Sequence, residues 1–223
     1  MKQMLLDLRP DAPPAFTNFV SGANAALVQA LRDAIGGGDH VYLWGPSGSG
    51  RTHLLRAAVS AAVEAGRPAR YLAGAMIGEA LPGEPGQLLA IDDVESLTEA
   101  GRSAVFNAFN RARSDSNTLL LSGETPPIEL LMREDLRTRI GQCLVFEVRP
   151  LDDATRAAII ATLAERRGLN LQQEVIDFLL RHGRRDMPSL ITAVDAIDRA
   201  SLESKRPATL PLLRKLMQTG LDI

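Results

Sequence analysis

The segment G-P-S-G-S-G-R-T, residues 45–52, combines residue types that bind phosphate groups. In the phosphate-binding loop G-x-x-x-x-G-K-[ST], the glycines let backbone N–H groups approach phosphate oxygens, and the Ser or Thr hydroxyl binds Mg²⁺. Gly45, Gly50 and Thr52 fit this pattern. The segment lies between a predicted strand and a predicted helix, which is the setting that the motif requires. We therefore prefer a phosphate-binding loop to an ordinary glycine-rich turn.

Arg51 stands at the position that lysine occupies in this motif. Lysine places a compact charge on the terminal phosphates, whereas the guanidinium is larger, planar and forked, and contacts phosphate from a different place. Because phosphoryl transfer depends mainly on positioning and charge, this difference weakens hydrolysis more than binding. We expect a nucleotide-stabilised switch rather than an ordinary ATPase.

A second motif, L-L-A-I-D-D-V at residues 88–94, resembles a Walker B segment, an apolar strand that ends in carboxylates. We expect Asp92, at the end of this strand, to hold Mg²⁺ together with Thr52. Asp93 is expected to orient or deprotonate an attacking water. Acidic pairs also follow strands simply as turn residues, but a pair placed after a phosphate-binding loop favours a nucleotide site.

The pattern of apolar residues changes along the chain. From about Phe16 to Pro150, short apolar runs alternate with helical stretches, which predicts a parallel sheet covered by helices on both faces. After Pro150, apolar residues recur only at helical spacing, which predicts a small all-helical unit. The expected strands span 41–45, 69–74, 88–92, 118–123 and 143–148, and the expected helices span 51–66, 99–114, 127–140, 152–168, 172–183, 186–204 and 209–220.

These patterns divide the chain into three expected parts. Residues 1–15 form a flexible tail, because Pro10, Pro13 and Pro14 resist helix formation. Residues 16–150 form an α/β nucleotide-binding domain, and residues 151–223 form a helical domain.

Composition and charge point to a cytoplasmic protein. The net charge of −2 gives no positive field that would attract DNA or an anionic membrane, so strong direct DNA binding is not expected. The single cysteine, Cys143, excludes an intramolecular disulfide and suits a reducing compartment. No apolar stretch reaches the length of a membrane span.

Several segments together resemble the AAA+ module of the replication initiator DnaA. The N-terminal segment 15–27 resembles the part that supplies the adenine pocket, with Phe19 as the implied contact. L-L-L-S-G-E-T-P-P, residues 119–127, resembles sensor 1, with Ser122 and Glu124 as polar candidates. The resemblance implies an α/β AAA+ P-loop NTPase fold, followed by a small all-helical lid domain. The implied nucleotide-binding residues are Gly45, Pro46, Ser47, Gly48, Ser49, Gly50, Arg51, Thr52, Phe19, Asp92 and Glu124.

The same resemblance identifies an arginine finger. In D-L-R-T-R-I-G, residues 135–141, Arg139 occupies the position of the family's finger, and Arg137 is the alternative register. Such a finger acts in trans on the nucleotide of a neighbouring subunit. At the family's sensor 2 arginine this chain has Pro188, and the nearby basic candidates are Arg184 and Arg185.

The tail segment Q-M-L-L-D-L, residues 3–8, resembles the hexapeptide Q-L-x-L-x-L that binds the replication sliding clamp. The implied clamp-binding residues are Gln3, Met4, Leu5, Leu6 and Leu8. A short DnaA-like AAA+ chain with such a tail is most similar to the Hda family, the regulatory inactivators of DnaA, which commonly carry arginine in the phosphate-binding loop. The simpler alternative is a disordered, slightly apolar N-terminus.

This resemblance implies a regulator that binds ADP or ATP with Mg²⁺. Its implied partners are DnaA and the DNA polymerase III sliding clamp (the β subunit). The resemblance also allows association of the chain with copies of itself as a homo-oligomer. Such a protein stimulates ATP hydrolysis by DnaA and inhibits re-initiation of replication. Two alternatives remain from the sequence: an ATP-dependent helicase loader or other replication-associated AAA+ ATPase, and an autonomous ATPase, which Arg51 and Pro188 disfavour.

Overall fold

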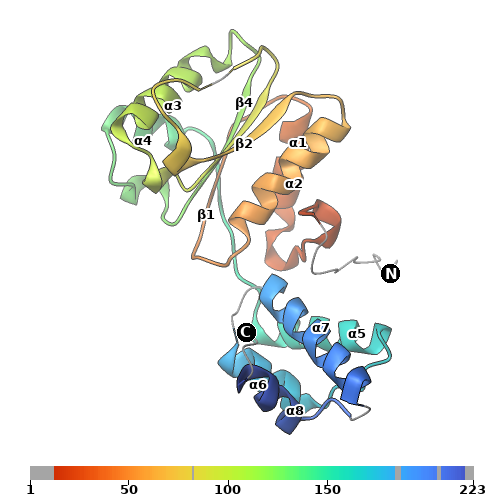
Figure 1. Ribbon diagram of the computed structural model, residues 1–223. Coiled ribbons are helices and arrows are strands. Elements are labelled where there is room, and N and C mark those ends of the chain that lie inside the picture. Colours follow the sequence, from red (N-terminus) through yellow and green to blue (C-terminus); the bar gives the residue numbers. More distant parts are fainter. Residues whose placement is uncertain (1–12, 82, 184–186, 205–206, 219–223) are drawn as a thin grey trace. The chain divides into compact units, whose positions relative to one another are not determined.

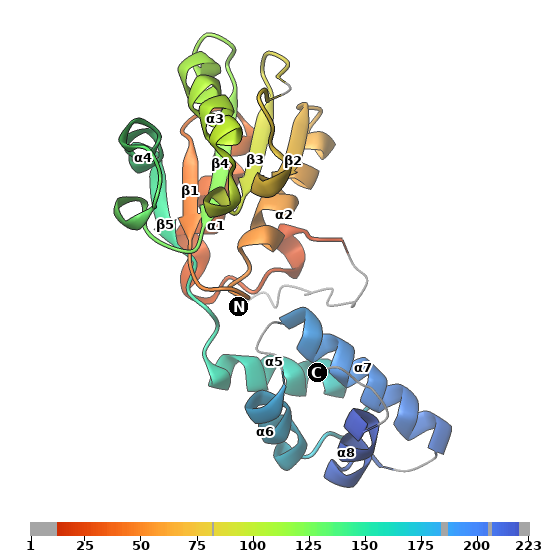
Figure 2. The same cartoon turned by 60° about the vertical axis from the view of Figure 1, so that its left-hand side comes forward.

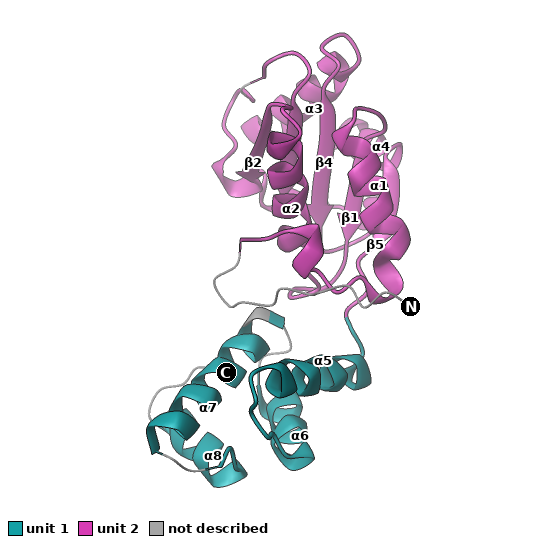
Figure 3. Ribbon diagram, turned by 90° about the vertical axis from the view of Figure 1, so that its right-hand side faces the viewer, with its two compact units in different colours: residues 1–12, 151–223 teal, residues 13–150 magenta. Residues whose placement is uncertain are grey.

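The computed structural model of the chain describes residues 13–81, 83–183, 187–204 and 207–218. Two compact units are present, one formed by residues 13–150 and the other from residue 151 onward (Figure 3). Each unit has its own hydrophobic core.

The first unit is built on a five-stranded parallel sheet with the strand order β2-β3-β4-β1-β5. β3 and β4 are buried along their whole lengths, which explains their continuous apolar sequences. Because all strands run the same way, the carboxyl ends of β1, β3 and β4 meet at one edge of the sheet. The strands are β1 Val41–Trp44, β2 Ala69–Ala73, β3 Leu88–Asp92, β4 Thr118–Gly123 and β5 Leu144–Glu147.

Helices cover both faces of the sheet (Figure 2). α1, Ala25–Ile35, and α2, Arg51–Glu64, pack on one face. α3, Glu99–Ala112, and α4, Glu134–Gly141, pack on the other. The sequence patterns did not predict α1, although its buried residues recur at helical spacing (Leu27, Val28, Leu31 and Ala34).

The single helix expected over residues 127–140 is wrong. A 3-10 turn spans Pro127–Glu129, and α4 begins only at Glu134. Pro126 and Pro127 lack backbone donors, and the φ and ψ of Leu130, −64° and 123°, are extended rather than helical. This extended stretch carries Leu130 into the core, where it is 1% exposed. The arginine-bearing helix is therefore short.

The second unit consists of four described helices (Figure 1), as the spacing of its apolar residues predicts. Asp152 caps the first of these helices, because its side chain accepts a hydrogen bond from the backbone N–H of Thr155. None of the described helices is both long and apolar enough to cross a lipid bilayer. The helices are α5 Asp153–Arg166, α6 Gln173–His182, α7 Met187–Ser204 and α8 Leu210–Gln218.

His40 directly precedes β1 and contacts β4, at the edge of the sheet opposite to the phosphate-binding loop. Its ring Nδ1 lies 3.1 Å from the backbone nitrogen of Leu119 and accepts that N–H, so this nitrogen carries no proton. The ring also meets Phe109 edge-on, with ring centroids 5.4 Å apart. Burial lowers the pKa of His40 below 6.5, and the nearby charge of Asp39 opposes this shift.

Stability is expected to fall as the pH drops below about 6.5, the ordinary histidine pKa. Below that value the unfolded chain binds a proton that folded His40 resists, so acid favours unfolding. Burial shifts the pKa of His53 in the same direction. His40→Asn retains an acceptor for the Leu119 N–H but does not titrate. Urea unfolding at pH 7.5 and 6.0 should show a smaller pH effect in this variant than in the parent.

The control is His182→Asn, which removes an exposed histidine of the helical unit. It should keep the parent's pH effect. An undiminished pH effect in His40→Asn would contradict the assignment of the loss to this buried ring.

Candidate nucleotide-binding site

Residues 45–50 connect β1 to α2 as a loop that leaves little room for side chains. A Cβ atom on Gly45 would lie 2.7 Å from the carbonyl oxygen of Val148. Gly50, the N-cap of α2, has a φ of 102°, which glycine adopts without strain. A Cβ there would also lie 2.9 Å from the ring of Phe19. Glycine is therefore required at both positions, and the loop leads directly into the N-terminus of α2, the end of a helix that favours anions.

Two buried polar atoms of the loop region have no hydrogen-bond partner within the described parts of the chain. They are the hydroxyl oxygen of Ser49 and the NH1 nitrogen of Arg51. Buried polar groups are nearly always hydrogen-bonded, so each such exception calls for an explanation. A phosphate group supplies acceptors for both atoms. These two unpartnered atoms are therefore consistent with a ligand that carries phosphate groups.

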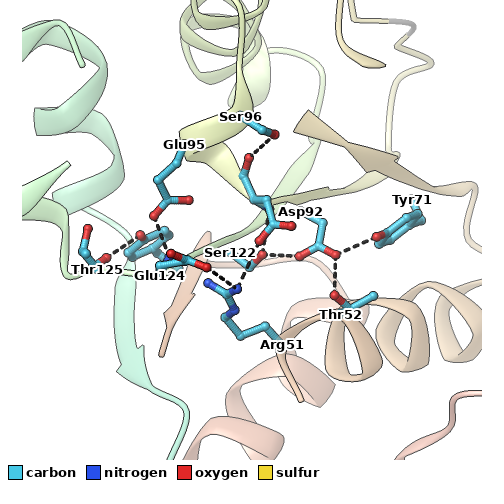
Figure 4. A network of polar contacts seen from close by, with 11 residues as sticks. Arg51, Thr52, Tyr71, Asp92, Glu95, Ser96, Ser122, Glu124 and Thr125 are labelled. Carbon is cyan, nitrogen blue, oxygen red and sulfur yellow. Dashed lines mark hydrogen bonds and ion pairs between the residues drawn. The ribbon is translucent and has the colours of Figure 1, made fainter. Parts of the chain in front are cut away.

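Asp92, at the end of β3, is 3% exposed and receives hydrogen bonds from three hydroxyl groups (Figure 4). The hydroxyls of Thr52 and Tyr71 each lie 2.6 Å from Oδ2, and the Ser122 hydroxyl donates to Oδ1. A hydroxyl beside a carboxylate is a donor set that Mg²⁺ accepts, since this ion prefers oxygen ligands. Thr52 and Asp92, the predicted metal ligands, are thus brought together.

Arg51 turns its guanidinium toward two further carboxylates (Figure 4). Its NH2 nitrogen lies 3.2 Å from Oδ1 of Asp93 and 3.8 Å from Oε1 of Glu124. The residue is only 8% exposed, so these ion pairs are poorly screened on the arginine side. Sequence reasoning placed all three residues at the nucleotide but did not predict that they pair with one another.

Asp93 has a left-handed backbone conformation, with a φ of 55°. Aspartate tolerates this region better than most residues, and the backbone N–H of Asp93 donates to the Ser122 hydroxyl at 3.0 Å. Burial raises the pKa of Asp93, and the neighbouring charge of Asp92 raises it further, whereas Arg51 lowers it. The hydrogen bond of its backbone N–H to Ser122 therefore helps to hold the Asp93 carboxylate beside Arg51.

The segment after β4 is fixed by contacts that the sequence motifs did not identify. Glu95 accepts the backbone N–H of Glu124 at 2.5 Å (Figure 4). The hydroxyl of Tyr42 donates to the carbonyl of Thr125 at 2.6 Å. Burial raises the pKa of Tyr42, so its hydroxyl keeps its proton. Tyr71 was also missed, because a tyrosine in an edge strand belongs to no motif; its only signal is a hydroxyl on the strand beside β3.

Phe19, the adenine contact that the resemblance implies, lies beside the loop. Its ring lies next to Gly50, and its centroid is 5.7 Å from that of His53. The Nε2 of His53 lies 3.1 Å from the carbonyl oxygen of Ala15, which ties the N-terminal segment to α2. An aromatic ring is thus held beside Gly50, where the phosphate-binding loop meets α2.

Arg139 lies apart from this network. It is in the last turn of α4, is exposed, and donates from NH2 to Oδ1 of Asn110 on α3 at 3.1 Å. Arg137 is half-buried, and Pro188 lies in the first turn of α7. The remaining predicted positions lie outside the described residues: Gln3, Met4, Leu5, Leu6, Leu8, Arg184 and Arg185.

Comparison with known proteins supports the resemblance from two sides. The family model of the Hda lid domain matches residues 153–217. The structure is similar to AMPPCP-bound DnaA from Aquifex aeolicus, with a TM-score of 0.68 and 23% identity, covering 86% of this chain and 67% of that one. It is also similar to domain III of DnaA from Thermotoga maritima, with a TM-score of 0.72 and 20% identity, covering 97% of this chain and 99% of that one.

The likeness extends beyond initiators. RuvB from Thermotoga maritima has a TM-score of 0.70 and 20% identity, covering 93% of this chain and 72% of that one. At these identities the structural matches establish the fold, and the family model establishes the type of lid. The chain has the AAA+ fold of the DnaA-like proteins, with an α/β unit followed by an Hda-type lid domain.

Proposed function

We propose that the chain is an Hda-like regulator that binds an adenine nucleotide, ADP in the working state, together with Mg²⁺. The observation that carries the nucleotide proposal is the pair of buried, unpartnered donors in the loop region, Ser49 and Arg51. Residues 45–50 and Arg51 would hold the phosphates, and Phe19 would lie near the base. Thr52 and Asp92 would hold Mg²⁺, which neutralises phosphate charge when bound. The similar DnaA structure from Aquifex aeolicus contains AMPPCP, which supports the proposal that this fold binds a nucleotide.

The arrangement favours slow hydrolysis by the chain itself. A general base needs an accessible carboxylate oxygen close to the attacking water. Here Oδ1 of Asp93 lies 3.2 Å from the NH2 nitrogen of Arg51, and this ion pair occupies the oxygen that would accept a proton from water. The nucleotide then acts as a structural ligand, and the protein works mainly through its effect on a partner.

The proposed effect on the partner is catalysis in trans by Arg139. Its guanidinium is exposed at the end of α4, and its described hydrogen bond goes to Asn110 and not to the network around Arg51. An exposed arginine on a short helix can enter the nucleotide site of a neighbouring AAA+ subunit. We propose that this neighbour is DnaA with bound ATP, and that hydrolysis inactivates it and inhibits re-initiation.

The tail at residues 3–8 is proposed to attach the protein to the β sliding clamp. An extended segment places alternate side chains into pockets, and a glutamine adds hydrogen bonds. The prolines behind it supply reach. The protein would act in the cytoplasm, where replication proteins and the clamp are found, and self-association through AAA+ contacts fits the same fold.

Arg139→Ala should reduce DnaA–ATP hydrolysis by about 10³-fold or more, because an arginine finger contributes about 10³ to 10⁵ to the rate. The measurement is phosphate release by DnaA–ATP with DNA-loaded clamp and the full chain. Arg139→Lys should not restore the rate, since lysine lacks the planar fork. Thermal stability should stay near that of the parent, because the one described hydrogen bond of the side chain is exposed.

Arg137→Ala is the matched control on the same helix, and its effect should be much smaller. If Arg139→Ala stimulates DnaA as the parent does, another residue performs the reaction. Loss of folding in this variant would show instead that Arg139 is structural.

The triple variant Gln3→Ala, Leu6→Ala, Leu8→Ala should lose clamp binding in a pull-down assay and keep the parent's thermal unfolding. The reason is that the sequence predicts these positions to be part of a tail that precedes Pro10, Pro13 and Pro14. Asp7→Ala is the control within the same segment, since Asp7 is at a variable position of the hexapeptide pattern, and this variant should bind the clamp as the parent does. Clamp binding equal to that of the parent would refute the tail assignment.

A further inference from the structure

The guanidinium of Arg51 forms ion pairs with Asp93 and Glu124, and these pairs affect which nucleotide the proposed site prefers. We infer that Glu124 is a specificity-determining residue: its carboxylate competes with the terminal phosphate of a triphosphate for Arg51 and so makes the site favour a diphosphate. This inference rests on the proposed nucleotide site and is independent of the proposed action on DnaA.

The two ends of the guanidinium have different surroundings. NH2 lies 3.2 Å from a carboxylate oxygen of Asp93 and 3.8 Å from one of Glu124. NH1 is buried and has no hydrogen-bond partner among the residues that the structure describes. A phosphate at the loop therefore finds one free nitrogen rather than the whole fork. A terminal phosphate that needs both nitrogens must displace the carboxylates.

The local charge opposes a further anion at this end of the site. Four carboxylates belong to one connected set of contacts, and two of them, those of Asp93 and Glu124, contact the guanidinium of Arg51 directly. The hydroxyls of Thr52, Tyr71 and Ser122 compensate only one of these groups, Asp92. Like charges a few ångströms apart repel strongly where water is partly excluded. A triphosphate brings more negative charge to this place than a diphosphate does. The four carboxylates belong to Asp92, Asp93, Glu95 and Glu124.

Glu124 is the member of the set whose charge can be removed without disturbing the core. Its side chain is 62% exposed, and its backbone, not its carboxylate, is held by Glu95. Asp92, in contrast, is buried under three hydroxyl groups, and Asp93 has the left-handed backbone conformation. Substitution at Glu124 therefore changes the charge facing Arg51 while the fixed β4 segment stays in place.

The test is isothermal titration of the full chain with ADP and with AMPPCP, a non-hydrolysable triphosphate, in Mg²⁺. Glu124→Gln keeps the size of the side chain and removes its charge. The ratio of the AMPPCP Kd to the ADP Kd should fall by about tenfold, which corresponds to about 1.4 kcal/mol. Glu124→Ala should lower the ratio similarly, so the result does not depend on the fold of one variant.

Glu129→Gln is the matched control, because Glu129 is an exposed carboxylate on the 3-10 turn Pro127–Glu129. Its ratio should stay within about twofold of the parent's. The inference is overturned if the two Glu124 variants keep the parent's ratio, or if Glu129→Gln lowers the ratio equally. Failure of the parent to bind either nucleotide would overturn the nucleotide site itself. Normal binding without stimulation of DnaA would overturn only the proposed regulation.

Discussion

Burying the carboxylate of Asp92 at the end of β3 is costly unless hydrogen bonds replace the lost water, and three hydroxyl groups supply them. Each hydrogen bond to a charged group contributes about 1.5 to 3 kcal/mol. The donors come from α2, β2 and β4, so one charge joins the helix after the phosphate-binding loop to two neighbouring strands. The hydrogen bonds that Asp92 needs therefore fix the positions of the start of α2, the predicted metal ligands and the end of β4 relative to one another.

Arg51 extends the same network to a second pair of acids. In the usual loop, lysine serves the phosphates; here the cation also serves Asp93 and Glu124. Under the proposed function, this sharing would leave phosphate binding possible and weaken hydrolysis, since Asp93, which pairs with Arg51, is the acid proposed to activate water. A site of this kind suits a protein that carries a nucleotide as a structural ligand. The exposed Arg139, on a different helix, contacts Asn110 and takes no part in this network.

Much of this arrangement follows from periodicity and motif spacing. The five strands and the lid helices were predicted because buried parallel strands read as continuous apolar runs and helices as a 3.6-residue repeat. α1 was missed, since its segment was assigned by resemblance and its own periodicity was not used. The helix expected from Pro127 was wrong because the buried side chain of Leu130 fixes an extended stretch before α4. At Leu130, burial of the side chain in the core outweighed the local tendency to form a helix.

Some residues of the candidate site were predicted from the sequence, and others were not. The sequence predicted Gly45, Gly50, Thr52 and Asp92 as site residues because phosphate and metal binding impose local spacing, and the structure brings Thr52 and Asp92 into contact. Tyr71 and Glu95 were not predicted, because their roles depend on which strands and turns become neighbours in space. The pairing of Arg51 with Asp93 and Glu124 is likewise a tertiary property.

The most direct test of this account is a crystal structure of the chain with ADP and Mg²⁺. The account predicts the β-phosphate at the loop, with an oxygen about 2.7 to 3.2 Å from NH1 of Arg51, while NH2 remains paired with Asp93. A guanidinium that leaves both carboxylates and turns its whole fork to the phosphate would contradict the account, as would a nucleotide bound away from residues 45–52.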